Sequence, residues 1–277
     1  MISGKRNLFI YSLLLTVICL SGLAVSAQEK SKTYEFCSHN NWSNGDKVSY
    51  SEKREMTIAA TGSLSVDGRQ NGGIKVVGEN RSDILIQACV QTWGKSEAEA
   101  QSIAKAIRIE AGSVVRAENL SEDMNGSVSY HIFVPRATNL NLKAHNGGIS
   151  ISSVQGTLDF ETTNGGIKLE DVGGNVRGRT ANGGVKVDLT GTSWIGTGLD
   201  VETTNGGVKL SLPSNYSANV ETGTVNGGFK SDFAELNPPK DEKDRWSRPK
   251  RVNASLNGGG APIRVITTNG GVKVSQF

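Results

Sequence analysis

The stretch ETTNGGIKLEDVGGNVRGRTANGGVKVDL, from Glu161 to Leu189, contains the triplet Asn-Gly-Gly twice, 18 residues apart. Each triplet is followed by a branched apolar residue, a lysine and another apolar residue. Along the 277-residue chain the triplet begins at Asn71, Asn146, Asn164, Asn182, Asn205, Asn226, Asn257 and Asn269. From Asn146 onward the gaps are 18, 18, 23, 21, 31 and 12 residues. A period near 20 residues predicts a solenoid, whose coils bury their apolar sides by stacking on one another.

The residues on both sides of each triplet alternate between two faces. Before Asn164 the residues of one face are Leu158, Phe160 and Thr162, and after it Ile167 and Leu169 continue that face. A period of two is typical of a strand with one buried side. The fold class is therefore predicted to be all-β, a parallel β-solenoid whose coils of about 18–23 residues each contain two strands and two corners.

Charges at equivalent positions of successive coils support in-register stacking. Stacked parallel strands lie about 4.8 Å apart, so opposite charges on neighbouring coils attract each other. The signs alternate in two columns, Lys143, Glu161, Arg179 and Glu202 in one, and Asp159, Arg177 and Asp200 in the other.

The triplet itself is interpreted as a structural corner. We expect its glycines to supply the positive φ angles of a sharp turn, and its asparagines to stack into a ladder of amide hydrogen bonds. The predicted ladder consists of Asn146, Asn164, Asn182, Asn205, Asn226 and Asn269. Asn257 is assigned to the second type of corner, so its loss should destabilise the fold less than the loss of Asn182. A ligand site along the asparagine row is the alternative interpretation.

The first 27 residues resemble a secretory leader. Lys5 and Arg6 precede a short apolar run, and small residues end at Ala27, which is typical of a signal peptide covering residues 1–27. A membrane anchor is the alternative, but the run is short for a bilayer. We therefore expect export to the periplasm or the cell exterior. Cleavage leaves 28 basic and 27 acidic residues, which removes the main electrostatic support for a nucleic-acid partner.

The mature chain is predicted to have two parts. Residues 28–135 form a strand-rich segment with a helix at 95–109, and residues 136–277 form the solenoid. A charged, proline-containing excursion at 234–251 interrupts one coil. Cys37 and Cys89 remain after cleavage, and an even pair in an exported chain predicts a disulfide, with two unpaired buried thiols as the alternative.

The sequence contains no convincing catalytic, cofactor or metal-binding pattern, so a non-enzyme without a cofactor is expected. The remote alternative is a polysaccharide-acting enzyme that uses Asp159 and Asp200. Two coils would separate these residues by about 9.6 Å, near the carboxylate spacing of an inverting glycosidase. Arg177 on the coil between them argues against this hypothesis, because a cation keeps both carboxylates ionised.

A row of lysines lies four residues after the asparagines. We expect these side chains to point outward on four successive coils, from Lys168, Lys186, Lys209 and Lys230. Like charges at strand spacing are unfavourable unless they are neutralised. One interpretation is a solvated face, and the other is a stripe that binds an anionic polymer, such as an acidic glycan, or lipid headgroups. An envelope protein is a further candidate partner.

Three segments together resemble a known family. They are VSYHIFVPRATNLNLKAHNGGISI at 128–151, LDFETTNGGIKLEDVGGNVRGRTANGGVKV at 158–187 and NGGGAPIRVITTNGGVKV at 257–274. They are similar to the bacterial Toastrack domain, also labelled an adhesin domain, and the resemblance extends from Glu52 to Phe277. It implies a β-solenoid, no established enzymatic activity, and either a surface interaction module or a scaffold of an envelope-stress system. It supplies no functional residues to transfer.

Overall fold

The computed structural model describes residues 36–37, 47–120, 125–237 and 251–277, all within one compact unit, Glu35–Phe277. The predicted leader and most of the predicted excursion lie outside the described residues. Within the described part, no helix is long and apolar enough to span a membrane.

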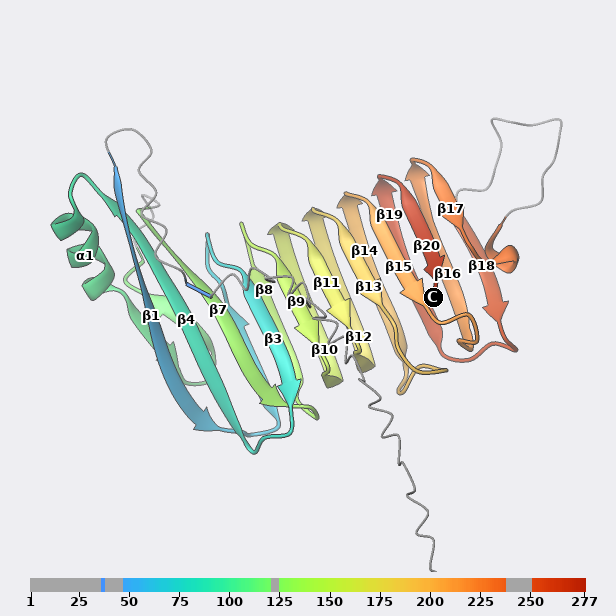
Figure 1. Ribbon diagram of the computed structural model, residues 1–277, viewed down its shortest axis with the longest axis horizontal. Coiled ribbons are helices and arrows are strands. Elements are labelled where there is room, and N and C mark those ends of the chain that lie inside the picture. Colours follow the sequence, from blue (N-terminus) through green and yellow to red (C-terminus); the bar gives the residue numbers. More distant parts are fainter. Residues whose placement is uncertain (1–35, 38–46, 121–124, 238–250) are drawn as a thin grey trace, which may run out of the picture. The chain divides into compact units, whose positions relative to one another are not determined.

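The described chain forms two sheets of ten strands each (Figure 1). Sheet I contains, in spatial order, β1 (Val48–Ala59), β4 (Asp83–Gly94), β7 (Gly126–Pro135), β3 (Ile74–Glu79), β9 (Ile149–Ser152), β11 (Ile167–Glu170), β13 (Val185–Asp188), β15 (Val208–Leu212), β20 (Val272–Gln276) and β17 (Phe229–Ser231). Sheet II contains β18 (Arg251–Leu256), β16 (Ala218–Asn226), β19 (Pro262–Asn269), β14 (Gly198–Asn205), β12 (Gly173–Asn182), β10 (Gln155–Asn164), β8 (Asn139–Ala144), β2 (Ser63–Asp67), β6 (Val115–Glu118) and β5 (Arg108–Ala111).

Each coil gives one strand to each sheet, and an Asn-Gly-Gly corner joins the two strands except in the coil of β6 and β7, which lacks the triplet. Equivalent residues pair between neighbouring coils, so that Asn182 is opposite Asn164 on one side and Asn205 on the other. The inward residues of both sheets, such as Leu158, Phe160 and Leu169, are buried in one continuous core. The predicted parallel β-solenoid is confirmed.

The order of the coils in space differs from their order in the chain. The C-terminal coil, β19 and β20, lies between the coil of β14 and β15 and the coil of β16 and β17 (Figure 1). At the other end, β2 and β3 lie between the coil of β6 and β7 and the coil of β8 and β9. At the C-terminal end, β19 and β20 are thus inserted between two coils that precede them in the chain. At the N-terminal end, β2 and β3 lie between two coils that follow them in the chain.

This insertion corrects the predicted lysine row. Lys209 is paired with Lys273 rather than with Lys230, and Lys230 is the outermost member beyond Lys273. Lys168, Lys186, Lys209 and Lys230 are therefore not on four successive coils. The physical reason is that all Asn-Gly-Gly coils have equivalent edges, so any of them can stack on any other. The C-terminal coil can therefore stack between two coils that are consecutive in the sequence.

The expected role of the glycines in the triplet is also wrong. Only Gly270 among the triplet glycines from Asn71 to Asn226 and at Asn269 has a positive φ. Instead, a Cβ on the first glycine of each corner would collide with the backbone of the adjacent coil. At Gly183 it would lie 2.1 Å from the carbonyl oxygen of Gly165. Close stacking of coils, rather than a left-handed turn, requires this glycine. Positive φ angles do occur at the second type of corner, at Asn257, Gly258, Gly259 and Gly260.

The predicted helix at 95–109 is shorter in the structure. Helix α1 spans Glu97–Ala106, and the Ser96 hydroxyl accepts a hydrogen bond from the Glu99 backbone N–H at 3.3 Å. It ends at Ala106 because the next residue, Ile107, has an extended backbone and leads into β5. Strands from both sides of residue 135 contribute to both sheets. The division of the mature chain at that residue stays a prediction about independent folding.

Candidate functional site

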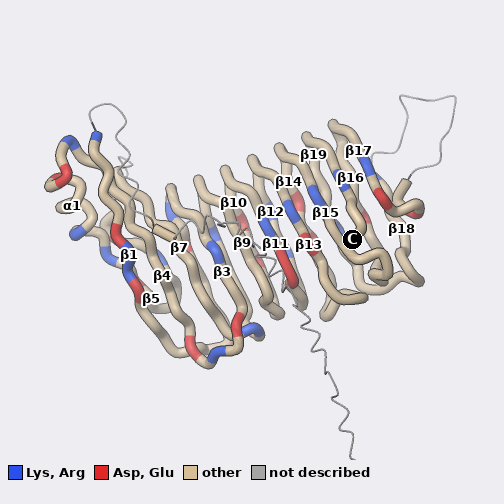
Figure 2. The backbone as a smooth tube through the Cα atoms, in the orientation of Figure 1, with Lys and Arg blue, Asp and Glu red and all other residues tan. Residues whose placement is uncertain are grey.

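The lysine row crosses the outer face of sheet I. Each lysine is exposed and follows an apolar residue that is buried, or half-buried in the case of Phe229 before Lys230, so strand alternation directs the lysine side chain outward. The row across adjacent strands β11, β13, β15, β20 and β17 consists of Lys168, Lys186, Lys209, Lys273 and Lys230. In Figure 2 the basic positions recur from strand to strand along the tube.

The row is neutralised at one end only. Lys168 forms an ion pair with Glu170 at 2.9 Å, and Lys186 forms one with Asp188 at 2.6 Å. The hydrogen bond with Asp188 raises the pKa of Lys186. The strands β15 and β20 have serine at the position of these carboxylates, whereas Asp232 occupies that position after Lys230 without coming within ion-pair distance of it. Among the described residues, Lys209, Lys273 and Lys230 have no ion-pair partner within 4.0 Å, so three like charges stand on neighbouring strands.

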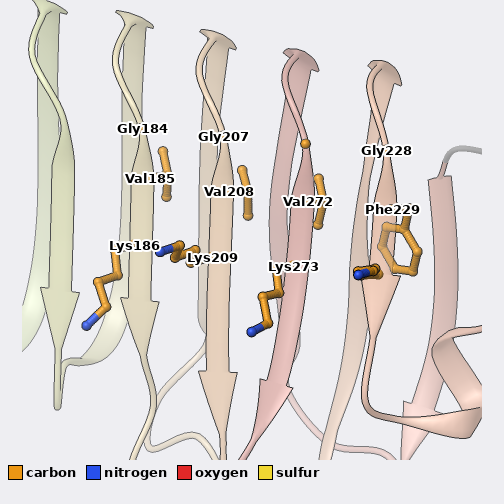
Figure 3. Close-up of a pocket in the computed structure, with 12 residues that line it drawn as sticks. Gly184, Val185, Lys186, Gly207, Val208, Lys209, Gly228, Phe229, Val272 and Lys273 are labelled. Atoms are coloured by element: carbon orange, nitrogen blue, oxygen red, sulfur yellow. The ribbon is translucent and has the colours of Figure 1, made fainter.

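A groove of about 740 Å³ accompanies this unneutralised part of the row. Its lining repeats on four strands as the second glycine of the corner, the following apolar residue and the lysine. The repeated members are Gly184, Val185 and Lys186, with Gly207, Val208 and Lys209, then Gly271, Val272 and Lys273, and finally Gly228, Phe229 and Lys230. Figure 3 shows the lysines leaving consecutive strands and the ring of Phe229 at the end of the row.

A second groove continues along the same face toward the N-terminal strands. It has a volume of about 530 Å³ and includes Gly148, Gly166, Lys75 and Lys168. Phe36 forms part of its wall. The two grooves involve neighbouring strands, because β11 lines one and β13 lines the other. The outer face of sheet I is therefore hollowed along most of its parallel strands.

The disulfide holds Phe36 at this second groove. Cys37 and Cys89 form a bridge with their Cα atoms 5.2 Å apart. The ring of Phe36 contacts the ring of His131 edge-on, with centroids 5.5 Å apart. Burial, with a smaller contribution from Lys75, lowers the pKa of His131 to about 4. At neutral pH this imidazole is therefore uncharged and serves as packing surface for the aromatic ring.

The outer face of sheet II is electrostatically different, because its charges neutralise one another. Arg179 pairs with Glu202, and the inserted Arg264 pairs with both Asp200 and Glu202. Asp200 thus lies between Arg177 and Arg264 in the strand register. Asp200 is thus held in an ion pair with Arg264, an arrangement typical of a structural charge network. The geometry gives the hypothetical Asp159–Asp200 pair no support as a catalytic site.

The asparagine row forms a continuous ladder of hydrogen bonds. In every step the side-chain Nδ2 donates to the Oδ1 of the neighbouring asparagine, at 2.8 to 2.9 Å. The order of the ladder is Asn71, Asn146, Asn164, Asn182, Asn205, Asn269 and Asn226. Each inner side-chain amide thus donates one hydrogen bond to one neighbouring asparagine and accepts one from the other.

Two features of the corners were missed in the sequence. A buried threonine two residues before the asparagine donates its hydroxyl proton to the first glycine carbonyl of the adjacent coil, as Thr180 does to Gly165 at 2.8 Å. The recurring Thr-x-Asn-Gly-Gly pattern was the available signal. The second glycine of each corner also lines the outer grooves, and its outward position followed from the strand alternation.

One protein family and several solved structures match this chain. A family model described as Toastrack DUF4097 matches residues 23–275. The chain is similar to the crystal structure of a "putative cell adhesion protein" from Clostridium sporogenes, with 10% identity and a TM-score of 0.41 over 82% of this chain and 100% of that one. It is also similar to a "putative adhesin" from Bacteroides fragilis, with 10% identity and a TM-score of 0.42 over 82% and 97% of the two chains. A search of curated proteins finds no match.

Proposed function

The chain belongs to the Toastrack family, and we propose that it is an adhesin-like, non-catalytic module that binds an extended anionic polymer on the outer face of sheet I. The supporting observation is the row of Lys209, Lys273 and Lys230 along a groove, without carboxylate partners among the described residues. Positive charges that repeat at strand spacing suit a ligand whose negative charges also repeat. Lipid headgroups and an envelope protein are the competing partners.

The site of action that fits this proposal is outside the cytoplasm, in the periplasm or at the cell surface. The leader pattern of residues 1–27 supports export. The Cys37–Cys89 bridge adds a second argument, because disulfides persist in oxidising compartments and are rare in the cytosol. Acidic polymers of the cell envelope or of a host surface would then be accessible to the lysine row.

Binding to acidic and neutral forms of one polysaccharide tests the proposal. Polygalacturonate and its methyl ester share a sugar backbone but differ in charge. We expect the native protein to bind polygalacturonate at low salt, and more weakly at physiological salt, because exposed charges are screened within about 8 Å. Replacing Lys209, Lys273 and Lys230 by Gln should weaken binding by about tenfold, since exposed ion pairs contribute about 0.2–1 kcal/mol each.

A matched control removes the same charge elsewhere. The control variant replaces Lys95, Lys105 and Lys143 by Gln, three exposed residues outside both grooves of sheet I. It should bind polygalacturonate as the native protein does. Equal binding by the native protein and the groove variant would contradict the proposal, and equal weakening in both variants would indicate a general charge effect.

A further inference from the structure

The two glycines of each Asn-Gly-Gly corner are required for different reasons. A Cβ on the first glycine would lie 2.0–2.2 Å from a carbonyl oxygen of the neighbouring coil, so no side chain fits there. The second glycine has no such conflict in the C-terminal half of the solenoid. A Cβ at Gly184 or Gly207 would come no closer than 3.4 Å to another atom, and at Gly271 no closer than 3.7 Å.

Backbone conformation does not require the second glycine either. None of Gly184, Gly207, Gly271 and Gly228 has a positive φ, and around Gly228 nothing lies within 4 Å of the Cβ position. These glycines lie immediately before the strands, and glycine loses more conformational entropy on folding than any other residue. The stack of coils therefore tolerates a side chain at these positions and is weakened by its absence.

The second glycines form one continuous strip on the face that carries the lysines. All but Gly73, which is half-buried, are exposed, and all but Gly228 precede a buried residue; Gly228 precedes the half-buried Phe229. This alternation directs the glycines outward, like the lysines two residues later. The strip across sheet I consists of Gly73, Gly148, Gly166, Gly184, Gly207, Gly271 and Gly228. Its floor is bare backbone, and the lysine row runs parallel to it at about 7 Å, the length of two strand residues.

A side-chain-free strip beside a charged row selects a particular shape of ligand. Sugar rings can lie flat on exposed peptide planes and Cα groups, while carboxylates on the ring edge reach the lysines. The coils repeat every 4.8 Å or so, about the length of one sugar in an extended chain. A membrane surface would need several protruding apolar side chains, and among the residues that line this groove only Phe229 is a partly exposed apolar one. A charge-only ligand would gain nothing from the missing side chains.

We infer that the glycine strip is a binding track for a carboxylated polysaccharide, which lies across the strands with its rings on the glycines and its carboxylates at Lys209, Lys273 and Lys230. This inference rests on the proposed function and assigns it a ligand class. In this arrangement the glycines determine specificity for ring-shaped units, and the lysines supply the charge.

The experiment fills the strip without changing any charge. The variant Gly271→Thr/Gly228→Thr places side chains where the structure offers open space. We expect it to keep its native melting temperature and to bind polygalacturonate about tenfold more weakly, because the rings lose contact with two adjacent strands. Its binding to linear polyphosphate, a flexible polyanion without rings, should stay within about twofold of native. The Lys209, Lys273, Lys230→Gln variant should lose affinity for both polymers.

Two further variants keep the test decisive. Gly112→Thr introduces the same side chain at an exposed glycine outside the grooves, where nothing lies within 4 Å, and should bind as the native protein does. Gly271→Ala/Gly228→Ala provides a smaller obstruction if the threonine variant fails to fold. Native-like polygalacturonate binding by folded glycine variants would overturn the track while leaving the lysine site intact. Equal loss of polyphosphate binding would also overturn it. Native-like binding by the lysine variant would instead refute the proposed function.

Discussion

At the scale of single residues, the Asn-Gly-Gly corner combines three separate constraints. The asparagine joins the amide ladder, the first glycine lets neighbouring backbones approach, and the second glycine stays exposed on the groove. A buried threonine two residues earlier adds a hydroxyl bond to the adjacent coil. The coils of Asn164, Asn182, Asn205, Asn226 and Asn269 therefore contact a neighbouring coil through backbone, amide and hydroxyl groups at one edge, which explains why the same short sequence recurs.

The contrast between adjacent glycines gives a direct prediction. Gly183→Ala should destabilise the protein by about 1–3 kcal/mol, because its Cβ would overlap the carbonyl oxygen of Gly165 and force the coils apart. Gly184→Ala, one residue later, should be neutral or slightly stabilising. Urea unfolding of both variants measures the difference. Similar midpoints for the two variants would show that stacking does not depend on the first glycine.

Asn257, at the second type of corner, makes more hydrogen bonds than the sequence suggested. Asn182 and Asn257 were expected to differ, with Asn257 the less important. In the structure Asn257 donates to the carbonyl oxygens of Ser214 and Tyr216, at 3.1 and 3.0 Å, and has a φ of 49°. Alanine at this position would lose both bonds and occupy a left-handed conformation. Asn257 is therefore unsuitable as a mild control for the ladder.

At the scale of elements, the strands and corners of the coils could be predicted because their signals are local. Alternation around Asn164 and Asn182 indicated which residues face the core, and the charge columns indicated the register. The ends of α1 were less predictable, because Ile107 continues the apolar stripe of the helix while its extended backbone leads into β5. The groove was missed because glycines were interpreted only as turn residues.

The disulfide between Cys37 and Cys89 of β4 is expected to stabilise the fold. The bridge closes a loop with a sequence separation of 52 residues. The chain-entropy model gives about 4 kcal/mol of stabilisation for such a loop. The variant Cys37→Ser/Cys89→Ala should therefore unfold at a clearly lower denaturant concentration than the oxidised native protein.

The control for the disulfide uses the native chain under reducing conditions. Reduction should move its midpoint toward that of the double variant, and should leave the double variant unchanged. A native midpoint that is insensitive to a reducing agent, with the bond shown by mass spectrometry to be broken, would contradict a stabilising role for the bridge.

At the scale of the whole molecule, the order of the coils could not be predicted. All corners share one sequence, so local patterns cannot say which coil stacks on which. One signal was present in the column of Asp200 and Glu221, two acids that successive coils would bring together. The inserted Arg264 stands between them and pairs with both, at Asp200 and at Glu221. A break in the charge alternation thus marked the position of the C-terminal coil.

This insertion makes the C-terminal strands a central element of the solenoid, and truncation tests that role. A stop after Ala261 removes β19 and β20. In the described structure β17 pairs only with β20, and β16 pairs only with β19 and β18. We therefore expect β16, β17 and β18 to lose their hydrogen-exchange protection although they remain in the chain. The strands from β8 to β13 should keep theirs, because each coil depends mainly on its nearest neighbours. Mass spectrometry of the exchanged peptides separates the two regions. Protection of β16 to β18 in the truncated protein would mean that they dock directly on β14 and β15. That result would contradict the expectation that these strands depend on the C-terminal coil.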